Sequence, residues 1–341
     1  MNSESMEGAT YIILVNWNGW EDTLECLESV FRQPERNFRV VVCDNGSEDQ
    51  SLERIHEWAK GQRSASSASR EMAAYSTPHC GKPLSTQTLT RVEAETSDIK
   101  AEAPLVLIDC EENLGFAGGN NVGLRFALRQ SDMDSVWLLN NDTVVDANAL
   151  KTLRDKAART PNAGIIGSTV IYYHDPQRVQ AFGGARYFSC IGLSMHIGRF
   201  RDRLRTVDEA KIEAQLRYVL GASMFVPRRF LEEVGLMTED YFLYYEELDW
   251  ALRGKQRFSL GYAQHSRVYH KAGASIGSSN KSAHRSLLSD SYLMANRLEI
   301  TRRFFPRCLP FVRGFLLIEW LMRAVRGRKA HAAMILRLII K

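Results

Sequence analysis

The first half of the chain alternates short apolar runs with segments of helical periodicity. Apolar runs occupy residues 11–15, 39–43, 105–108, 136–139 and 164–173. Residues 21–31, 52–58 and 122–128 lie between them and carry apolar side chains at the spacing of an amphipathic helix. Strands that alternate with helices pack as a parallel sheet with helices on its faces. The sequence therefore predicts an α/β fold with a doubly wound, mostly parallel sheet.

The second half has a less regular pattern. Its predicted elements are hairpin strands with glycine turns over 182–198, an apolar strand over 219–226, a short helix from Pro227, a helix within 241–256, a short strand at 268–270 and a helix over 282–305.

Composition limits the class of protein. The 341 residues are 45% hydrophobic and 25% charged, as in a globular protein with one large domain and a sizeable core. The six cysteines form no CxxC pair, which argues against a zinc site and for free thiols in a reducing compartment. The first residues carry acidic side chains and no apolar stretch of the signal-peptide kind. We therefore expect a cytoplasmic protein.

Residues 61–103 interrupt the alternation of strands and helices. This segment is rich in Ser, Thr and Ala, contains Pro78 and Pro83, and shows no sustained apolar period. Such a composition buries little apolar surface and favours a disordered surface insertion over a domain. The predicted organisation is one domain over residues 1–300, with this insertion, followed by a tail over 301–341.

The tail is both apolar and strongly basic. Residues 302–341 contain ten Lys or Arg and one Glu, whereas the rest of the chain contains 34 basic and 39 acidic residues. No uncharged stretch in the tail is long enough to span a bilayer. Because the basic charge is confined to the tail, nucleic-acid binding is disfavoured.

Helical periodicity in the tail indicates an amphipathic helix that breaks near Gly327. At about 100° per residue, one sector of about 60° holds a set of charged residues. The set is Glu319, Arg323, Arg326, Arg337 and Lys341, while Arg313, Arg328 and Lys329 fall outside it. Basic amphipathic helices bind anionic membrane surfaces, so we expect contact with a membrane. The alternative is a helix that packs on the protein's own core with a solvated basic face.

The segment Leu138–Thr143 is the most informative site candidate. An apolar strand runs directly into Asn140, Asn141 and Asp142. The carboxyl ends of strands in an open α/β sheet are where ligands bind. One carboxylate beside amide oxygens suits a hard divalent cation that keeps positions free for phosphate oxygens. The alternative is a turn or helix cap, which the same residues also favour.

Further polar residues follow other predicted strands. They are Asp44, the segment 113–121 and His270. The glycines of 113–121 would let the backbone approach a ligand and begin a helix at Asn121, and the asparagine amides can bond a nucleotide. The segment is neither GxGxxG nor a P-loop, and it follows the third strand instead of the first, which disfavours dinucleotide binding.

Taken together, the motifs resemble glycosyltransferase family 2, the inverting nucleotide-sugar enzymes of GT-A fold, and within it the rhamnosyltransferase-like branch of cell-surface polysaccharide assembly. The resemblance covers roughly residues 10–300 except the insertion. The matching pieces are 15–18, 42–49, 113–121, 139–143, 221–223, 242–253 and His270. A departure lies in the late helix, where Ala295-Asn296 stands in place of the Arg-Asn that family members often carry.

The resemblance implies roles for individual residues. Asp44 matches the acid that bonds the nucleotide base, Asp142 the carboxylate of the family's DxD motif, and His270 a histidine that completes the metal shell. The first acid of that motif is here Asn140, and the metal would be Mg²⁺ or Mn²⁺. The other residues expected to bind the nucleotide-sugar are Asn16, Asn113, Gly115, Asn120, Asn140 and Asn141.

The resemblance also implies a catalytic base. Glu247 aligns with the family's base, whereas Glu246, Asp249 and Arg253 share one helix face and are expected to form a structural ion network. Crowded carboxylates raise at least one pKa, which suits a group that must accept a proton.

The implied function is a metal-dependent inverting hexosyltransferase in polysaccharide synthesis. The donor would be a nucleotide-sugar, with dTDP-rhamnose as the first choice, and the acceptor a lipid-linked saccharide at the inner face of the cell membrane. One alternative is a nucleotidyltransferase, but residues 16–19 lack the glycine- and Lys/Arg-rich loop expected after its first strand. Another is a non-catalytic, membrane-associated nucleotide-sugar-binding protein. The presence of Asp142, Glu247 and His270 together argues against it.

Overall fold

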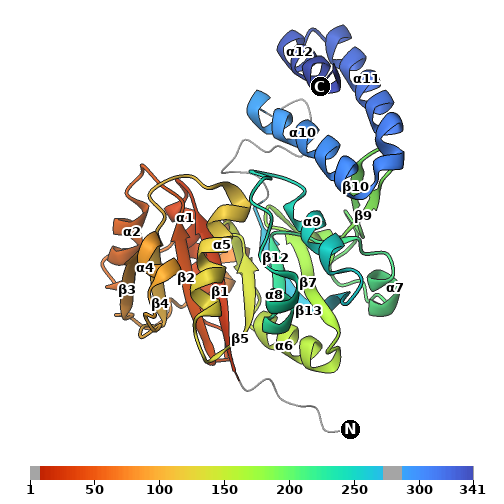
Figure 1. Cartoon of the computed structure of the whole chain (residues 1–341). Coiled ribbons are helices and arrows are strands. Elements are labelled where there is room, and N and C mark those ends of the chain that lie inside the picture. Colours follow the sequence, from red (N-terminus) through yellow and green to blue (C-terminus); the bar gives the residue numbers. More distant parts are fainter. Residues whose placement is uncertain (1–7, 272–285, 341) are drawn as a thin grey trace.

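A computed structural model describes residues 8–271 and 286–340 and places a mixed sheet at the centre of the molecule (Figure 1). Within these residues the sheet has ten strands, in the order β3-β4-β2-β1-β5-β12-β7-β13-β6, with β8 paired to β7. The strands are β1 (Ala9–Asn16), β2 (Phe38–Asp44), β3 (Thr86–Thr90), β4 (Leu105–Asp109), β5 (Met133–Leu139), β6 (Thr143–Val145), β7 (Ala163–Tyr172), β8 (Asp175–Phe182), β12 (Ser223–Pro227) and β13 (Ser259–His270).

The first part of this sheet is parallel, as the sequence predicts. Strands β3, β4, β2, β1 and β5 run in one direction, and β12 enters antiparallel between β5 and β7. In register, Asn16 lies beside Asp44, and Asp44 beside Asp109. The polar residues at the strand ends therefore meet at one edge of the sheet, where the chain turns away to form loops.

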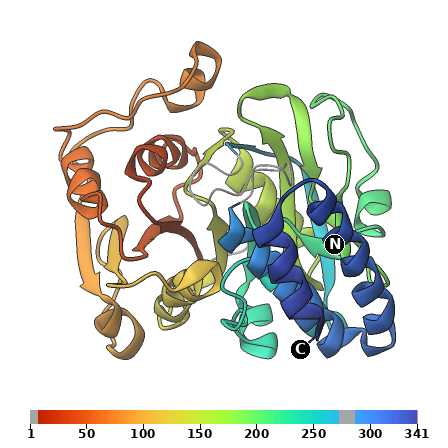
Figure 2. The same ribbon diagram turned by 90° about the horizontal axis from the view of Figure 1, so that it is seen from above.

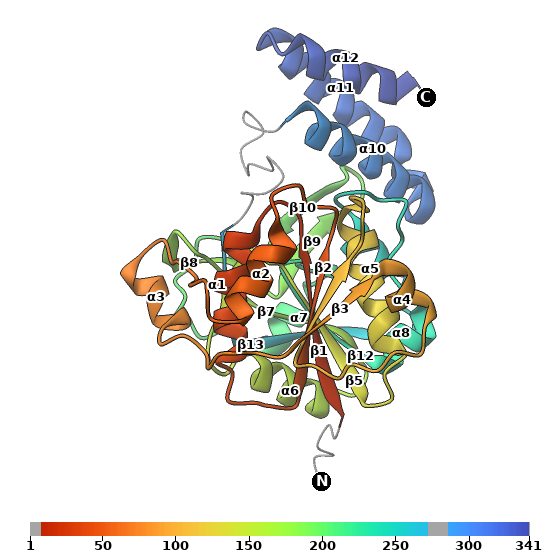
Figure 3. The same ribbon diagram turned by 90° about the vertical axis from the view of Figure 1, so that its left-hand side faces the viewer.

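Helices cover both faces of the sheet, as Figure 3 shows. Helices α1 (Trp20–Phe31), α2 (Ser51–Ala59) and α6 (Ala149–Arg159) pack on one face, and α4 (Arg91–Thr96), α5 (Gly115–Leu128), α8 (Arg228–Val234) and α9 (Glu246–Gly254) on the other. Alternate residues of β1 point to opposite faces of the sheet. Ile12 packs in the core under α1, α2 and α6, and Ile13 packs in the core under α4, α5, α8 and α9. The predicted α/β fold is confirmed.

A small second sheet and a helical unit complete the molecule. The sheet has the order β10-β9-β11 and consists of β9 (Gly184–Phe188), β10 (Leu193–His196) and β11 (Tyr218–Val219). The helical unit, here called the cap, consists of α10 (Leu287–Phe304), α11 (Leu309–Val325) and α12 (Lys329–Ile340). Figures 1 and 2 show the cap over the half of the molecule that holds β9, β10 and α9. Two short helices, α3 (Arg70–Ser76) and α7 (Glu209–Glu213), lie outside these groups.

The cap has its own apolar core, which includes Met294, Val312, Leu316 and Ile335. The predicted break near Gly327 is present, since α11 ends at Val325 and Gly327 has a φ of +73°. No helix in the described part of the chain combines the length and apolarity that crossing a bilayer requires. The predicted helix start at residue 282 and the position of Lys341 lie outside the described residues.

The part of the predicted polar sector that lies within α11 faces inward instead of outward, whereas Arg326 and Arg337 are exposed. Glu319 and Arg323 are 9% and 8% exposed, and they form ion pairs with α10. The residues that face out of α11 are apolar, with Phe311 65%, Ile318 56% and Val325 80% exposed. Periodicity identifies two faces of a helix, but it does not determine which face packs on the protein.

Residues 61–103, predicted to be a disordered insertion, are ordered. They form α3, β3 and α4, and β3 extends the sheet by pairing in parallel with β4. Met72, Leu89 and Ala94 are buried. The sequence pattern misses this because β3 is an edge strand, Thr-Gln-Thr-Leu-Thr, in which only one side chain faces the core.

We expect Leu89→Ser to lower the free energy of unfolding by at least about 2 kcal/mol, because it removes a buried side chain from the core. Val92→Ser, at a residue of α4 that is 66% exposed, is the matched control and should be nearly neutral. Chemical denaturation of both variants measures the difference. Equal stability would show that β3 does not pack on the body.

Candidate active site

A buried hydrogen-bond network lies at the carboxyl ends of β1 and β2. The side-chain amide of Asn16 donates to Asp44 at 2.6 Å and to Ser47 at 3.1 Å, while its oxygen accepts from Thr23 and Asn141. Burial raises the pKa of Asp44, although hydrogen bonds from Ser47 and Asn16 oppose the change. Asn16 and Asn141 therefore hold the strand ends together, and Asn141 also lines the central cavity.

The predicted glycine-rich loop is instead the first turns of α5, which begins at Gly115 and not at Asn121. A β-carbon on Gly119 would come within 2.9 Å of Val15, and one on Gly123 within 2.7 Å of Ile13. These glycines let the helix lie close against β1. The expectation that they bring backbone to a ligand is wrong for this part of the segment.

Gly115 itself joins two distant parts of the site. It has a φ of +72°, and a β-carbon there would lie 2.4 Å from the carbonyl oxygen of Phe242. That same oxygen accepts a hydrogen bond from the backbone N–H of Phe116 at 3.0 Å. Asn113 accepts from Asn45, and Asn120 donates to the carbonyl of Phe116. Gly115, Asn113 and Asn120 all line the cavity.

The two predicted metal ligands are in contact. Nε2 of His270, at the end of β13, lies 3.2 Å from Oδ1 of Asp142, and 3.5 Å from the side-chain nitrogen of Asn140. Nδ1 of His270 faces the side-chain oxygen of Gln180 at 2.9 Å. Burial alone would raise the pKa of Asp142, but attraction to His270 and to Lys271 lowers it below its usual value.

This arrangement fits a divalent cation. When Nδ1–H of His270 donates to Gln180, Nε2 presents a lone pair towards the Asp142 carboxylate, and a cation between them satisfies both. In residues 8–271 and 286–340, no group of three or more His, Cys, Asp or Glu side chains could hold a metal, so this site offers two such ligands. Two protein ligands leave most positions of a hard cation for diphosphate oxygens and water.

Two adjacent glutamates begin α9 and line the same cavity. Burial raises the pKa of Glu247 to about 6, with backbone hydrogen bonds from its own N–H and from Gly221 opposing the change. Burial, followed by repulsion from Glu247, raises the pKa of Glu246 well above its usual value. With a pKa of about 6, Glu247 is mostly ionised near pH 7, as a group that accepts a proton must be.

The predicted ion network on α9 is only partly correct. Asp249 pairs with Arg253 and with Arg303 of α10. Glu246 does not join them: it is 2% exposed, and its Oε2 has no hydrogen-bond partner among the described residues. Glu246 is a cavity residue that the sequence pattern does not reveal.

A strained turn positions both glutamates. Tyr244 and Tyr245 have φ values of +73° and +77°, which cost on the order of 1–2 kcal/mol each for residues with side chains. Asn296 of α10 holds the turn by donating to the carbonyls of Leu243 and Tyr244 at 2.8 and 3.1 Å. The cap is thus tied directly to the start of α9.

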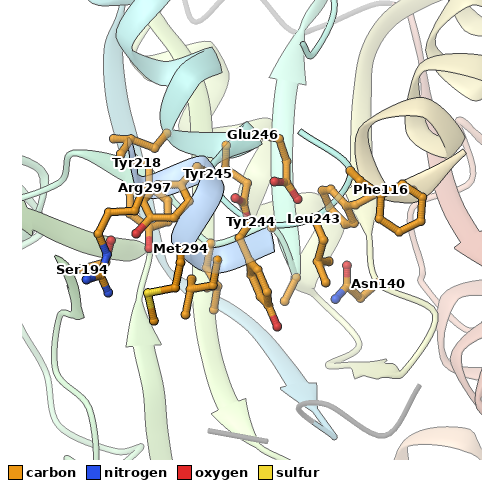
Figure 4. A pocket seen from close by; sticks show the side chains of 18 of the residues that line it. Phe116, Asn140, Ser194, Tyr218, Leu243, Tyr244, Tyr245, Glu246, Met294 and Arg297 are labelled. Carbon is orange, nitrogen blue, oxygen red and sulfur yellow. The ribbon is translucent and has the colours of Figure 1, made fainter. Parts of the chain in front are cut away.

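These residues surround one cavity of about 980 Å³. Figure 4 shows Glu246 between Asn140 and Phe116 on one side and Arg297 and Met294 on the other. Of the predicted site residues, Asn16 and Asp44 are absent from its lining, whereas Asn113, Gly115, Asn120, Asn140, Asn141, Asp142, Glu247 and His270 are present. Lining residues that sequence reasoning missed include Trp17, Gln180, Tyr218, Glu246 and Arg297. Trp17 and Glu246 lie within matching pieces of the resemblance but receive no site role there, whereas Gln180, Tyr218 and Arg297 belong to no motif. Only the Ala295-Asn296 departure pointed to the late helix.

Comparisons with known proteins agree with this architecture. Residues 11–67 match the family model described as Glycosyl transferase family 2. The low-salt glycan biosynthesis hexosyltransferase Agl10 of Haloferax volcanii is 27% identical over 159 residues, which are 46% of this chain and 48% of that protein. The chain thus matches about half the length of this curated relative.

Two solved structures show the fold. The mannosyltransferase PcManGT from Pyrobaculum calidifontis, in complex with GDP-Man and Mn²⁺, has a TM-score of 0.50 at 14% identity, covering 98% of this chain and 87% of that one. GalNAc-T7 with UDP, GalNAc and Mn²⁺ has a TM-score of 0.52 at 13% identity, covering 77% and 44%. The chain therefore has the GT-A glycosyltransferase fold, and its residues 11–67 carry the sequence pattern of glycosyltransferase family 2.

Proposed function

We propose that this chain is a metal-dependent, inverting hexosyltransferase that moves a sugar from a nucleotide-sugar to a lipid-linked saccharide in glycan synthesis. The observation that carries the proposal is that Glu247 and the Asp142–His270 pair line one cavity. A base and a site for a leaving diphosphate are the two parts that such a displacement needs. The hexosyltransferase name of the Haloferax relative and the Mn²⁺ complexes of the two structural neighbours also support it.

The proposed chemistry is a single in-line displacement. The Glu247 carboxylate takes the proton of an acceptor hydroxyl, and that oxygen attacks the anomeric carbon from the face opposite the nucleoside diphosphate. Asp142 and His270 would hold Mg²⁺ or Mn²⁺, which offsets negative charge on the departing diphosphate. Gly221 helps to place the base, because a β-carbon there would lie 2.4 Å from Oε1 of Glu247.

The nucleotide would occupy the end of the cavity lined by Trp17, Asn45 and Asn113. Asp44 would act through the loop at 45–47 rather than from the cavity wall, since its carboxylate is bonded to Asn16 and Ser47. We take dTDP-rhamnose as the first donor to test, because the sequence motifs resemble the rhamnosyltransferase-like branch.

We further propose that the protein binds peripherally to the inner face of the cell membrane through the cap. The apolar face of α11 points out of the molecule and contains Phe311, Ile318, Leu321 and Val325. Insertion of this face into the headgroup region would bury apolar surface that is otherwise exposed. Arginines around it would add electrostatic attraction to an anionic leaflet.

The two glutamates give a sharp test of the proposed base. Glu247→Gln should lower kcat by roughly 10² to 10⁴, the usual contribution of a positioned base, with little change in donor affinity. Glu246→Gln is the matched control and should keep most of the activity, because Glu246 is not the group proposed to take the proton. Loss of activity in Glu246→Gln with retention in Glu247→Gln would reverse the assignment.

The pH dependence follows from the same carboxylate. A base is active when deprotonated, so log kcat/KM should fall with unit slope as the pH drops below about 6, the pKa of Glu247. Initial rates between pH 4.5 and pH 8 measure the profile; stability at each pH is checked by reactivation at pH 7.5. A profile that stays flat through pH 5 would exclude Glu247 as the titrating base.

Removal of divalent cations should abolish transfer, and added Mn²⁺ should restore it. Asp142→Ala should be inactive while keeping a cooperative unfolding transition, because it deletes one of two proposed ligands. Rates of nucleoside diphosphate release with and without chelator check this. Full turnover in excess chelator would rule out the metal-dependent mechanism.

The membrane proposal predicts the effect of changing the outward face of α11. Replacing Phe311, Ile318, Leu321 and Val325 together by Gln should reduce partitioning onto anionic vesicles at least ~10-fold, because four exposed apolar side chains are lost. Val92→Gln, at an exposed apolar residue of α4, is the control and should leave partitioning unchanged. Vesicle sedimentation measures it, and equal sedimentation of both variants would refute membrane contact by this face.

A further inference from the structure

The cavity has a second arm that the proposed chemistry does not use. Beyond Glu246 it runs beneath the cap, where α10 and α11 supply its wall. Four arginines and one glutamate of the cap line it: Arg297, Arg323, Arg326, Arg328 and Glu319. The catalytic end, by contrast, is acidic through Glu247 and Asp142. One cavity therefore has an acidic end and a basic arm.

Arg297 is a buried arginine of this arm that is fixed by an ion pair and keeps an unsatisfied hydrogen-bond donor. It is 2% exposed, and its Nη1 donates to Glu319 at 2.8 Å. Its Nε has no hydrogen-bond partner among the described residues. A buried guanidinium N–H without a partner is unfavourable, so a ligand acceptor atom at this wall would be stabilised. Figure 4 shows Arg297 next to Met294, Tyr245 and Ser194.

Ion pairs fix the wall around Arg297. Glu319 accepts from Arg297 and from Arg323, and Arg323 also pairs with Asp290 at 3.1 Å. Asp290 in turn contacts His331 of α12. All three cap helices thus contribute to a preformed wall. Arg326 lies one helical turn after Met322, and its exposed side chain lines the cavity. Arginines held in this way suit phosphate oxygens.

Apolar side chains share the arm with the arginines. Met294 and Phe315 line it, and so do Leu288 and Met322, which are 64% and 44% exposed. The arm therefore opens beside the outward apolar face of α11. A ligand with an anionic group and a hydrocarbon chain can place the first among the arginines and the second along this face.

We propose that the basic arm binds the phosphate or diphosphate of a long-chain alcohol, which is the carrier of the saccharide acceptor. This rests on the proposed transferase function and names the anionic group by which that acceptor is recognised. The opposite charges at the two ends orient the acceptor, with its anionic group at Arg297 and Arg326 and its free hydroxyl towards Glu247.

The test measures binding to the full chain in neutral detergent with chelator present, so that the metal site cannot capture the probe. Farnesyl diphosphate, farnesol and inorganic diphosphate are titrated, with intrinsic tryptophan fluorescence and calorimetry as readouts. We expect farnesyl diphosphate to bind at least ~10-fold more tightly than either other probe, because only it fills both parts of the arm.

Variants locate the site. Arg326→Gln should weaken farnesyl diphosphate binding at least ~10-fold, whereas Arg302→Gln, at an exposed arginine of α10 that pairs with Glu299, should not change it. Arg297→Lys keeps the charge but loses the Nε donor, and it should weaken binding if the variant remains folded. Equal binding of farnesol and farnesyl diphosphate, or binding that is insensitive to Arg326→Gln, would overturn the proposal. Equal affinity for inorganic diphosphate would reduce the arm to a free-phosphate site and overturn the lipid assignment.

Nucleotide-sugar binding with Mn²⁺ and transfer to a short soluble acceptor are measured in parallel. Arg326→Gln should leave both unchanged, since neither uses the arm. Failure of these assays in the wild-type protein would count against the transferase function, whereas failure of the lipid titrations alone would count only against the arm.

Discussion

The parallel register of β1, β2 and β5 is the constraint on which the site depends. Because these strands run side by side in one direction, their polar ends meet at one edge, where Asn16 bonds Asp44 and accepts from Asn141. This buried network sets the direction in which the chain leaves β5. Asp142, the residue after Asn141, is thereby presented to the cavity beside His270 of β13.

A second constraint comes from the cap. Asn296 bonds the carbonyls of Leu243 and Tyr244, and Arg303 pairs with Asp249 at 2.9 Å. These contacts hold a turn with unfavourable backbone angles, from which α9 starts with its two glutamates. Strain at such a position persists when neighbouring elements over-determine it, and it commonly marks a functional site. The cap therefore helps to fix the positions of both glutamates.

The sequence predicts the fold well because apolar runs and helical spacing report directly on burial. It also brings Asp142 and His270 together, since residues at the carboxyl ends of parallel strands share an edge. Glu247 lies in the first turn of α9, and only the family resemblance pointed to it. The sequence fails where one pattern has two physical causes. Gly119 and Gly123 serve helix–sheet packing rather than a ligand, and the charged sector of α11 faces inward rather than out.

Other features carry no local signal at all. Strand β3 buries a single leucine, so its ordering depends on the edge that β4 offers. Glu246 and Arg297 reach the cavity only through the turn at 243–245 and the docking of α10, which are tertiary contacts. Long-range contacts of this kind are set by the whole fold, and a reading of single segments cannot supply them.

The most direct test of the central claim is a crystal structure of the full chain with Mn²⁺ and a non-transferable nucleotide-sugar analogue, with the metal located by its anomalous scattering. We expect Mn²⁺ to bind Asp142, His270 and the diphosphate. The nucleoside should lie beside Trp17 and Asn113, and the anomeric carbon should face the Glu247 side of the cavity. A nucleotide bound elsewhere, or a sugar separated from Glu247 by the protein wall, would contradict the account.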